Sequence, residues 1–215
     1  EVADQTVLAI TVKNNIDGVY HVWGLQDYDT DKALIKPVNY VKCESEPELL
    51  ARFVNHWRQE ENLPDVITGW NVRFFDIPYL INRINRVCGV DMVRQFSPWG
   101  LIDQRKIRRL NKEEMTYDIK GIQTMDYLEL FQKFGYSYGK QESYKLDHIA
   151  HVVLGEKKLS YEESGSLKNL YKDDFQKYID YNMKDVQLVD RLEEKMGLIT
   201  LGMTIAYKGG VNYQD

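Results

Sequence analysis

The alternation of apolar and polar residues changes period along the chain, and these changes divide it into predicted strands and helices. Two β-rich runs, TVLAITVKN (6–14) and GVYHVWG (18–24), flank the turn signal NNIDG, which predicts a β-hairpin. In SEPELLARFVNHWRQE (45–60), apolar residues recur at helical spacing, with Ser45 at the predicted N-cap and Pro47 in the first turn. The chain therefore opens with a hairpin and an amphipathic helix.

The middle of the chain has a strand followed by a helix. DVITGW (65–70) is a short apolar run that predicts an interior strand. DIPYLINRINRVCG (76–89) predicts a helix that is capped by Asp76 and ends near Gly89. Asp76 thus lies where a predicted strand gives way to a helix.

An inserted β-hairpin is predicted at about 104–121, because RKIRRLNKEEMTYDIKG has two strand-like arms around a polar tip at 111–114. The remaining elements are a strand leading into a helix (122–134), a helix ended by Gly155 (143–155), a loop with a short helical piece (158–171) and a long helix (172–197). Strands that alternate with helices predict an α/β fold, a mixed sheet flanked by helices. Because repeats and low-complexity linkers are absent, we expect one domain over 1–215.

Composition excludes several classes of protein. The chain is 43% hydrophobic and 28% charged, which is ordinary for a globular protein. No apolar run reaches the ~18–20 residues of a membrane span. Cys43 and Cys88 are too few for a disulfide framework or a zinc site, so we expect a reducing, cytoplasmic location.

Charge leaves a nucleic-acid partner open. The net charge of −5 gives no support for one, but QRKIRRLNK (104–112) is locally basic. A solvated charged loop and a phosphate-contacting hairpin both fit this run.

Two groups of residues are candidates for chemistry. Asp76 follows an apolar strand, where a sheet edge opens onto ligand space, although helix capping explains it equally well. Tyr181 and Asp185 are four residues apart and share one face of the long predicted helix, which could also be a solvated acidic face. His148 and His151 could chelate a metal ion but lack a third ligand nearby in the sequence.

Taken together, these motifs resemble a known family. NVRFFD (71–76), followed by YNMKD (181–185), resembles the second and third motifs of proofreading 3′→5′ exonucleases of the DEDD-Tyr type. The surrounding segments ITGWN, SYKLDHIA, KLSYEES and YIDYNMKDV are similar to the exonuclease domain of family B DNA polymerases, viral and phage members in particular. The resemblance runs from about Val7 to Tyr207.

The resemblance implies a ribonuclease H-like fold and hydrolysis of the 3′-terminal phosphodiester of a mispaired primer by two Mg²⁺ ions, for which Mn²⁺ can substitute. Asp76 and Asp185 would each bind a metal ion, Tyr181 would hold the attacking water and Lys158 would lie near the scissile phosphate. Asn71 would shape the turn on the substrate side and Phe75 would contact DNA. This is consistent with phosphoryl transfer, because two ions neutralise charge on the attacking and leaving oxygens and Mg²⁺ prefers carboxylate oxygens.

The sequence departs from the family at the first motif, Asp-x-Glu on the first strand. Glu1 is the only candidate for its glutamate, and we expect the strand itself to be absent. The polypeptide alone would then bind at most one metal ion well and be a weak or inactive exonuclease. The exposed edge of the 6–14 strand would favour self-association.

The predicted hairpin lies where viral family B polymerases carry one that helps to separate primer from template. Its basic residues would contact phosphates, and they are Arg105, Lys106, Arg108, Arg109 and Lys112. Residues 198–215 would begin the connection to the polymerase region.

The implied partners are single-stranded or frayed primer–template DNA, the remaining polymerase domains and a sliding clamp, in the cytoplasm of an infected host cell if the protein is viral. Two alternatives remain. One is a catalytically silent nucleic-acid-binding or scaffold module on the same fold, and the other is a free-standing repair exonuclease.

Overall fold

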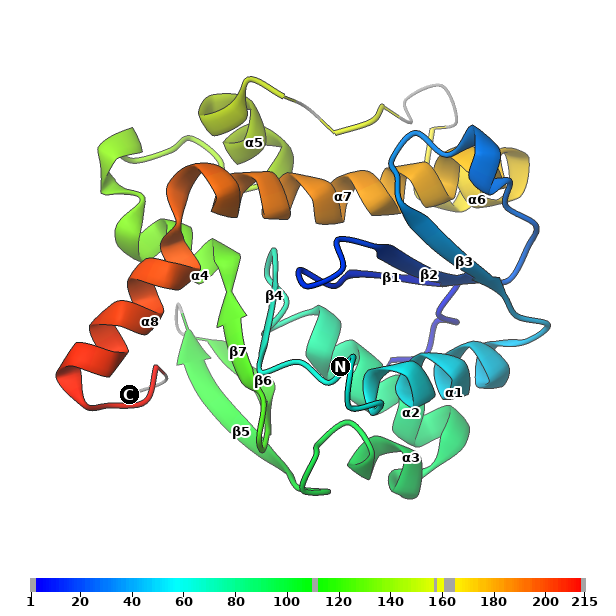
Figure 1. The fold of residues 1–215 in the computed structure, drawn as a ribbon, viewed down its shortest axis with the longest axis horizontal. Helices are drawn as coiled ribbons and strands as arrows, with labels where there is room; N and C mark the ends of the chain where they lie inside the picture. Colours follow the sequence, from blue (N-terminus) through cyan, green and yellow to red (C-terminus); the bar gives the residue numbers. More distant parts are fainter. Residues whose placement is uncertain (1–2, 110–111, 157, 161–164, 214–215) are drawn as a thin grey trace.

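The computed structural model describes residues 3–109, 112–156, 158–160 and 165–213, with the side chains of all of these except 109 and 112. Helices surround three small sheets, and one long helix lies across the top of the molecule in the view of Figure 1. The predicted mixed α/β fold is confirmed, with its strands divided among separate sheets. Glu1 lies outside the described residues.

The first sheet contains the predicted hairpin and one strand that the sequence analysis missed. β1 (Ala9–Lys13) pairs antiparallel with β2 (Tyr20–Gly24), and β2 pairs in parallel with β3 (Val38–Lys42). β3 has five residues of intermediate or full exposure, so it lacks the apolar alternation by which a half-buried strand is recognised. Among the described residues, β1 forms one edge of this sheet.

The second sheet has two parallel strands, β4 (Val66–Gly69) and β7 (Gln123–Asp126). Their register places Gly69 opposite Asp126, so the carboxyl ends of both strands meet at one edge.

The third sheet is the predicted inserted hairpin, β5 (Ile102–Arg109) and β6 (Lys112–Ile119). The predicted tip at 111–114 was wrong in extent. Residues 112–114 belong to β6, because Arg109 already pairs with Lys112 and only residues 110–111 separate the strands.

The helices are α1 (Glu46–Trp57), α2 (Asp76–Cys88), α3 (Val90–Arg94), α4 (Tyr127–Phe134), α5 (Leu146–Leu154), α6 (Leu167–Asp173), α7 (Phe175–Met196) and α8 (Leu198–Gly209), with short 3₁₀ turns at Thr30–Lys32 and Tyr136–Tyr138. The helices α1, α2, α4, α5, α6 and α7 match predicted segments, whereas α3 and α8 lie where the sequence analysis predicted no helix. α5 and α7 end at Gly155 and Gly197, whose φ angles of 74° and 62° suit the left-handed C-terminal position.

The predicted capping role of Asp76 was wrong. Asp76 is the first residue of α2 itself, Phe75 occupies the N-cap position, and no side-chain capping hydrogen bond forms at this helix start. The helix therefore begins one residue earlier than a cap at Asp76 would place it.

Three apolar clusters hold the elements in place. One joins α1 and α2 to the inner side of β1 and β2, and its largest members include Trp23, Phe53 and Phe96. The second joins β7, α4, α5 and the C-terminal half of α7 through Tyr127, Ile149 and Leu188, among others. The third joins β2 and β3 to the N-terminal half of α7. α7 therefore packs against both halves of the molecule, and its orientation is fixed by both.

Candidate functional site

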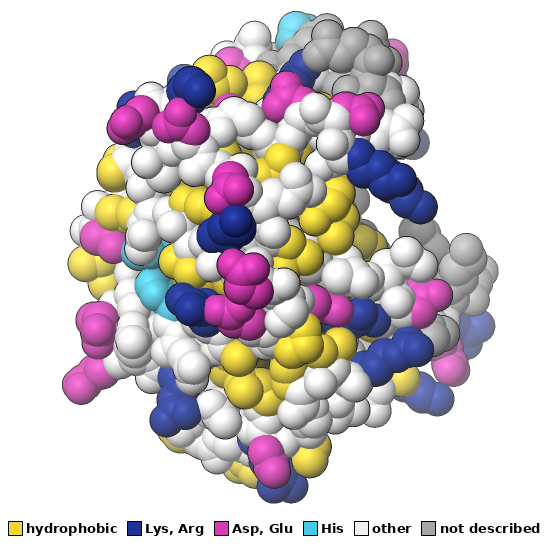
Figure 2. All heavy atoms as spheres, turned by 90° about the vertical axis from the view of Figure 1, so that its right-hand side faces the viewer, with side chains coloured by type: hydrophobic (Ala, Val, Ile, Leu, Met, Phe, Trp, Pro, Cys, Tyr) yellow, Lys and Arg dark blue, Asp and Glu magenta, His cyan; other side chains and the backbone are white. Residues whose placement is uncertain are grey.

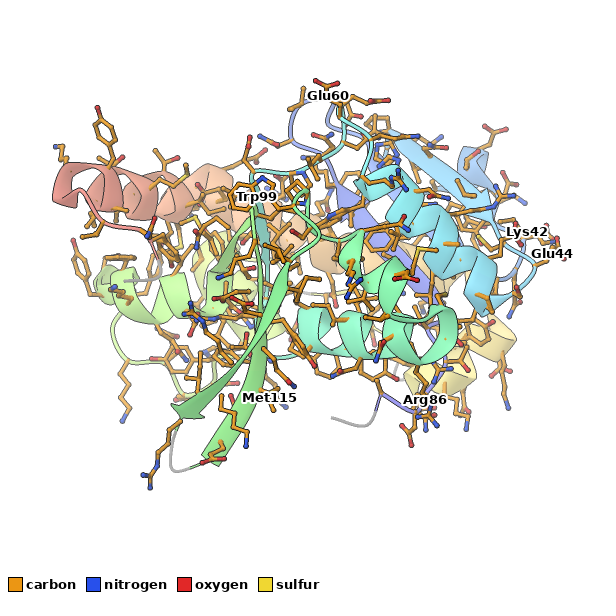
Figure 3. All side chains as sticks on the ribbon, turned by 90° about the horizontal axis from the view of Figure 1, so that it is seen from below. Lys42, Glu44, Glu60, Arg86, Trp99 and Met115 are labelled. Carbon is orange, nitrogen blue, oxygen red and sulfur yellow. The ribbon has the colours of Figure 1, made fainter. Side chains whose placement is uncertain are left out.

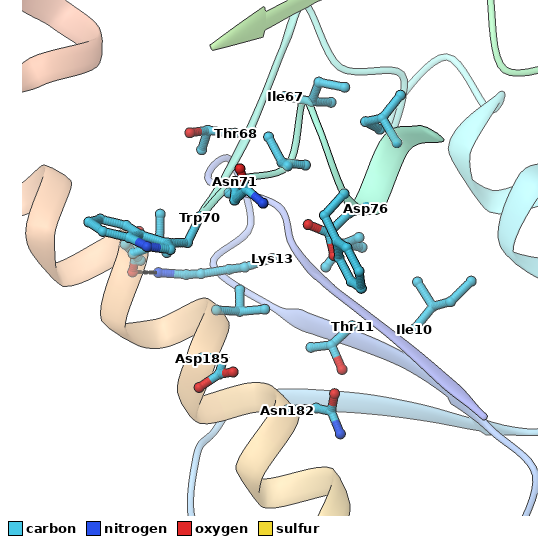
Figure 4. Close-up of a pocket in the computed structure, with 18 of the residues that line it drawn as sticks. Ile10, Thr11, Lys13, Ile67, Thr68, Trp70, Asn71, Asp76, Asn182 and Asp185 are labelled. Atoms are coloured by element: carbon cyan, nitrogen blue, oxygen red, sulfur yellow. Dashed lines mark hydrogen bonds and ion pairs between the residues drawn. The ribbon is translucent and has the colours of Figure 1, made fainter. Parts of the chain in front are cut away.

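A cleft of about 2000 Å³ opens between the first sheet, which contains β1, and the second sheet, which contains β4. Residues 6–16, which include β1, form one wall, and residues 61–72, which include β4, form the other. The start of α2 and one face of α7 complete the lining, and Figure 4 shows Asp76 and Asp185 pointing into this space from these two helices. The structure thus brings the two predicted metal-binding carboxylates, 109 residues apart in sequence, to one cleft.

The Asp76 side chain is accessible to solvent in the cleft, but protein atoms of the cleft walls lie close around it. The pKa of Asp76 is raised to about 6, mainly by burial and also by the charges of Asp126 and Asp185, while a hydrogen bond from its own backbone N–H opposes the shift. A raised carboxyl pKa in a cleft, caused by burial and by like charges, is typical of a site built to bind a cation.

Tyr181 and Asp185 are four residues apart on α7, and Lys158, from the segment after α5, lies next to both. Lys158 Nζ donates to Asp185 Oδ2 at 2.7 Å and lies 5.4 Å from the centre of the Tyr181 ring. Burial raises the pKa of Asp185, and the Lys158 ammonium opposes that shift. The Lys158 backbone N–H donates to Asp147 Oδ1 at 2.8 Å, which ties this segment to α5, a helix that packs against α7.

The second oxygen of Asp185 is suited to a cation. Oδ1 is buried and, within the part of the chain that the structure describes, has no hydrogen-bond partner. A buried acceptor without a donor is costly unless a cation or water satisfies it. The described residues contain no group of three acidic, histidine or cysteine side chains that could hold a metal ion.

Two further predicted residues lie at the same cleft. Asn71 lines it and has a φ of 65°, a left-handed conformation that asparagine tolerates better than most residues. Phe75 is 54% exposed, and its ring stacks on Tyr79 with centres 6.2 Å apart. An exposed aromatic ring at a cleft rim can stack on a base, so the DNA-binding role predicted for Phe75 stays a prediction.

The hairpin β5–β6 is built as predicted, but its basic residues have acidic neighbours. It lies beside α2, with Met115 on its β6 arm (Figure 3). Arg105 Nε lies 2.6 Å from Asp118 Oδ2, and Lys106 Nζ lies 4.0 Å from Glu113. Arg108 is exposed, whereas the side chains of Arg109 and Lys112 lie outside the described residues. Any DNA phosphate would therefore compete with protein carboxylates for Arg105 and Lys106.

Surface charge elsewhere is mixed. On the face drawn in Figure 2, acidic and basic side chains are interspersed, as expected for a net charge of −5. Among the described helices, none has both the length and the apolar character needed to cross a membrane.

The sequence analysis missed Asp126 and the pair formed by Lys13 and Asp190. Asp126 is 1% exposed and lies at the end of β7, next to the turn that carries Asp76. Its signal was present, because TMDYLELF places an aspartate between a strand and a helix just as Asp76 does. The ion pair of Lys13 and Asp190 joins β1 to α7 and gave no sequence signal, because its partners are 177 residues apart.

Comparison with known proteins is consistent with this geometry. The model of the DNA polymerase family B exonuclease domain matches residues 4–149. The DNA-directed DNA polymerase of Escherichia phage RB69 is 33% identical over 182 residues, which are 85% of this chain and 20% of that protein. The DNA-directed DNA polymerase of Enterobacteria phage T4 is 30% identical over 179 residues, 83% of this chain and 19% of that protein.

Cellular proteins are similar as well. The DNA polymerase delta catalytic subunit of Caenorhabditis elegans is 28% identical over 186 residues, 80% of this chain and 16% of that protein. The chain spans about a fifth of the length of the phage polymerases it matches.

Proposed function

The chain belongs to the exonuclease domain of the family B DNA polymerases, and from this premise we propose that it is a proofreading 3′→5′ exonuclease module that hydrolyses the 3′-terminal phosphodiester of a primer strand. The observation that carries the proposal is the placement of Asp76 and Asp185 in one cleft, with Tyr181 and Lys158 next to Asp185. DNA and the remaining part of a polymerase are the partners that this function requires, and a sliding clamp is a further one.

Exonuclease domains of this family use divalent metal ions, and the residues present fit part of such a site. Asp76 and Oδ1 of Asp185, which has no hydrogen-bond partner among the described residues, would hold the ion, because Mg²⁺ and Mn²⁺ prefer carboxylate oxygens. Mg²⁺ commonly takes only one or two carboxylates and completes its shell with water and substrate phosphate oxygens. When bound, such an ion neutralises phosphoryl charge and makes a water molecule more acidic.

The other side chains have separate roles in the proposal. The Tyr181 hydroxyl, one helical turn from Asp185, orients the attacking water. Lys158 balances the charge of Asp185 and, next to a bound substrate, places its ammonium near the scissile phosphate. Phe75 stacks on the terminal base at the rim of the cleft, and Asn71 shapes the turn that faces it.

The open space between β1 and β4 bears on the strength of the activity. Both strands present an edge to the cleft, and neither edge is paired across it within the described residues. An extended segment between them would join the two sheets, and carboxylates on it would complete the ligand set. With Asp76 and Asp185 alone, the domain binds at most one metal ion well and cleaves weakly.

The competing function is a catalytically silent nucleic-acid-binding or scaffold module. Two observations favour it, the lack of a three-ligand group among the described residues and the neutralisation of Asp185 by Lys158. In that case Asp76 and Asp185 would have structural roles only, and substitutions at these positions would not change the affinity for a divalent ion.

Mn²⁺ binding followed by electron paramagnetic resonance separates the two functions. Under the proposal, D76N and D185N each weaken Mn²⁺ binding at least tenfold, the usual scale of losing one ligand or its support. D190N is the matched control, because Asp190 lies on the same helix and in the same cleft but is paired with Lys13. Equal Mn²⁺ affinity in wild type, D76N and D185N would instead support the scaffold function.

A further inference from the structure

Asp126 is the buried carboxylate closest to the turn that carries Asp76, and its contacts exceed those of a helix cap. Its Oδ1 accepts from the backbone N–H groups of Leu128 at 2.9 Å and Glu129 at 3.4 Å, which caps α4. The same oxygen accepts from Asn71 N at 3.1 Å, and Oδ2 accepts from Arg73 N at 3.0 Å. One side chain therefore holds both the start of α4 and the turn after β4.

The turn from 71 to 75 is held at Arg73 from two sides. Asp126 accepts from the N–H of Arg73, and the hydroxyl of Thr116 on β6 donates to its carbonyl oxygen at 3.0 Å. Both side chains are almost fully buried, Thr116 at 0% and Asp126 at 1% exposed. The Arg73 side chain also pairs with Glu129 of α4 at 3.2 Å. The peptide groups that determine where α2 begins are thus fixed by buried neighbours.

A cap alone does not require this arrangement. Asparagine and serine cap helices as well as aspartate does, and neither places a negative charge in the protein interior. Burying a carboxylate costs free energy unless its oxygens are well bonded. Here the second oxygen is used for Arg73, on the segment that leads to Asp76 and not on α4.

We propose that Asp126 is a positioning residue, which aims the Asp76 carboxylate into the cleft by holding the backbone of the 71–75 turn through both of its oxygens. This inference rests on the proposed function, because it assigns Asp126 to the support of a cation-binding carboxylate. Thr116 contributes from the hairpin side through the carbonyl of Arg73.

The substitution D126N separates positioning from capping. An asparagine keeps one oxygen for the start of α4 but presents an NH₂ group to the N–H of Arg73, where two donors face each other. D174N is the matched control, since Asp174 caps α7 through Lys177 N at 2.9 Å and is exchanged for the same amide. T116V tests the same turn without altering α4, because valine has nearly the shape of threonine but no hydroxyl.

The experiment measures Mn²⁺ affinity and, without metal, amide hydrogen exchange of residues 71–76. We expect D126N to weaken Mn²⁺ binding about tenfold, as loss of an outer-shell partner typically does, and to speed exchange at Asn71 and Arg73. T116V should shift both readouts in the same direction by less, and D174N should leave both unchanged.

The possible results distinguish the positioning role of Asp126 from the existence of the metal site. Wild-type affinity and wild-type exchange in both D126N and T116V would overturn the positioning role. If D126N exchanges faster but D76N binds Mn²⁺ with wild-type affinity, the metal site is refuted, while Asp126 still holds the turn. Weaker Mn²⁺ binding in D126N with unchanged exchange would also overturn the positioning role, because the effect would then be one of charge alone.

Discussion

At the scale of single residues, the two carboxylates of the site differ in which groups balance their negative charge. Lys158 donates to one oxygen of Asp185, and the other oxygen is buried without a hydrogen-bond partner among the described residues, whereas Asp76 has like charges as neighbours. The Lys158 ammonium therefore lies on the carboxylate that we propose binds a divalent ion. A divalent ion bound by Asp185 must share that carboxylate with the ammonium or displace it.

Removing the ammonium should strengthen cation binding. We expect K158M to bind Mn²⁺ on the order of three- to tenfold more tightly than wild type at low salt, which corresponds to the ~1 kcal/mol of a partly exposed charge pair. K184M is the control, because Lys184 is next to Asp185 in the sequence but is paired with Glu156 at 3.0 Å. Weaker Mn²⁺ binding in K158M than in K184M would show that Lys158 supports the ion and does not compete with it.

Asp76 should make stability depend on pH in a defined direction. Its pKa rises from an ordinary value of 3.8 to about 6 in the folded protein, so between these values the folded state binds more protons than the unfolded state. The contribution of Asp76 to stability therefore falls as pH rises through this window.

The corresponding measurement is the melting temperature of D76N minus that of wild type, in the presence of a chelator. This difference should increase from pH 4 to pH 7, because asparagine does not ionise. D91N, at an exposed carboxylate on α3, should give a difference that hardly varies with pH. A pH-independent difference for D76N would contradict the raised pKa.

At the scale of elements, α7 and the β5–β6 hairpin differ in how firmly they are held. α7 is packed by two apolar clusters, which gives Tyr181 and Asp185 fixed positions. The hairpin is anchored at its base, where the Tyr117 hydroxyl donates to Asn82 of α2 at 2.7 Å and Thr116 bonds to the turn of the site. The hairpin is therefore connected to the same turn that presents Asp76.

Neutralising the hairpin should weaken proofreading without disturbing the fold. In an intact polymerase that carries this domain, we expect R105A/K106A/R108A to remove mismatched primer ends more slowly relative to extension. The dependence of DNA binding on salt should also become shallower, by less than the ~2 units of three full phosphate contacts, because Arg105 and Lys106 have acidic neighbours.

K32A/K42A/R52A is the matched control, since it removes equal charge from exposed positions on other elements. If both triple variants partition mismatched primers as wild type does, the hairpin has no role in strand transfer.

At the scale of the whole molecule, the main feature is that two of the three described sheets, the one with β1 to β3 and the one with β4 and β7, face each other across the cleft. β1 and β4 both present an edge there, and exposed strand edges pair readily with other chains. The cleft is thus both the site of the two carboxylates and the part of the fold most open to a further strand.

We expect the 215-residue chain to self-associate in sedimentation experiments, through the edge of β1. Adding an upstream strand that contains Asp-x-Glu should make it monomeric and increase Mg²⁺-dependent cleavage of single-stranded DNA. The same extension with Asn-x-Gln should also give monomers but no gain in cleavage, since it fills the gap without adding ligands. A monodisperse 215-residue monomer would refute the open edge, and equal cleavage by both extended forms would refute the role of the added carboxylates.

The local pattern of the sequence was sufficient for most elements. Periodicity and capping residues located α1, α2, α7 and the hairpin β5–β6 to within a few residues, because these signals act between neighbours in the chain. The ordered motifs around Asp76 and Asp185 indicated the family, which the match over residues 4–149 confirmed. The half-exposed strand β3 was missed because it has no such local signal.

The tertiary structure decided what depends on contacts between distant segments. It separated the described strands into three sheets, shifted Asp76 from the cap of α2 into the helix, and paired Lys158 with Asp185 and Arg105 with Asp118. It also gave Asp126 its bonds to a turn 53–55 residues away. The sequence alone determined which residue types were available and, through their spacing, the face of a helix or strand on which each one lies. Charge compensation and burial were decided by packing, because they depend on which segments meet, and spacing within one segment does not specify that.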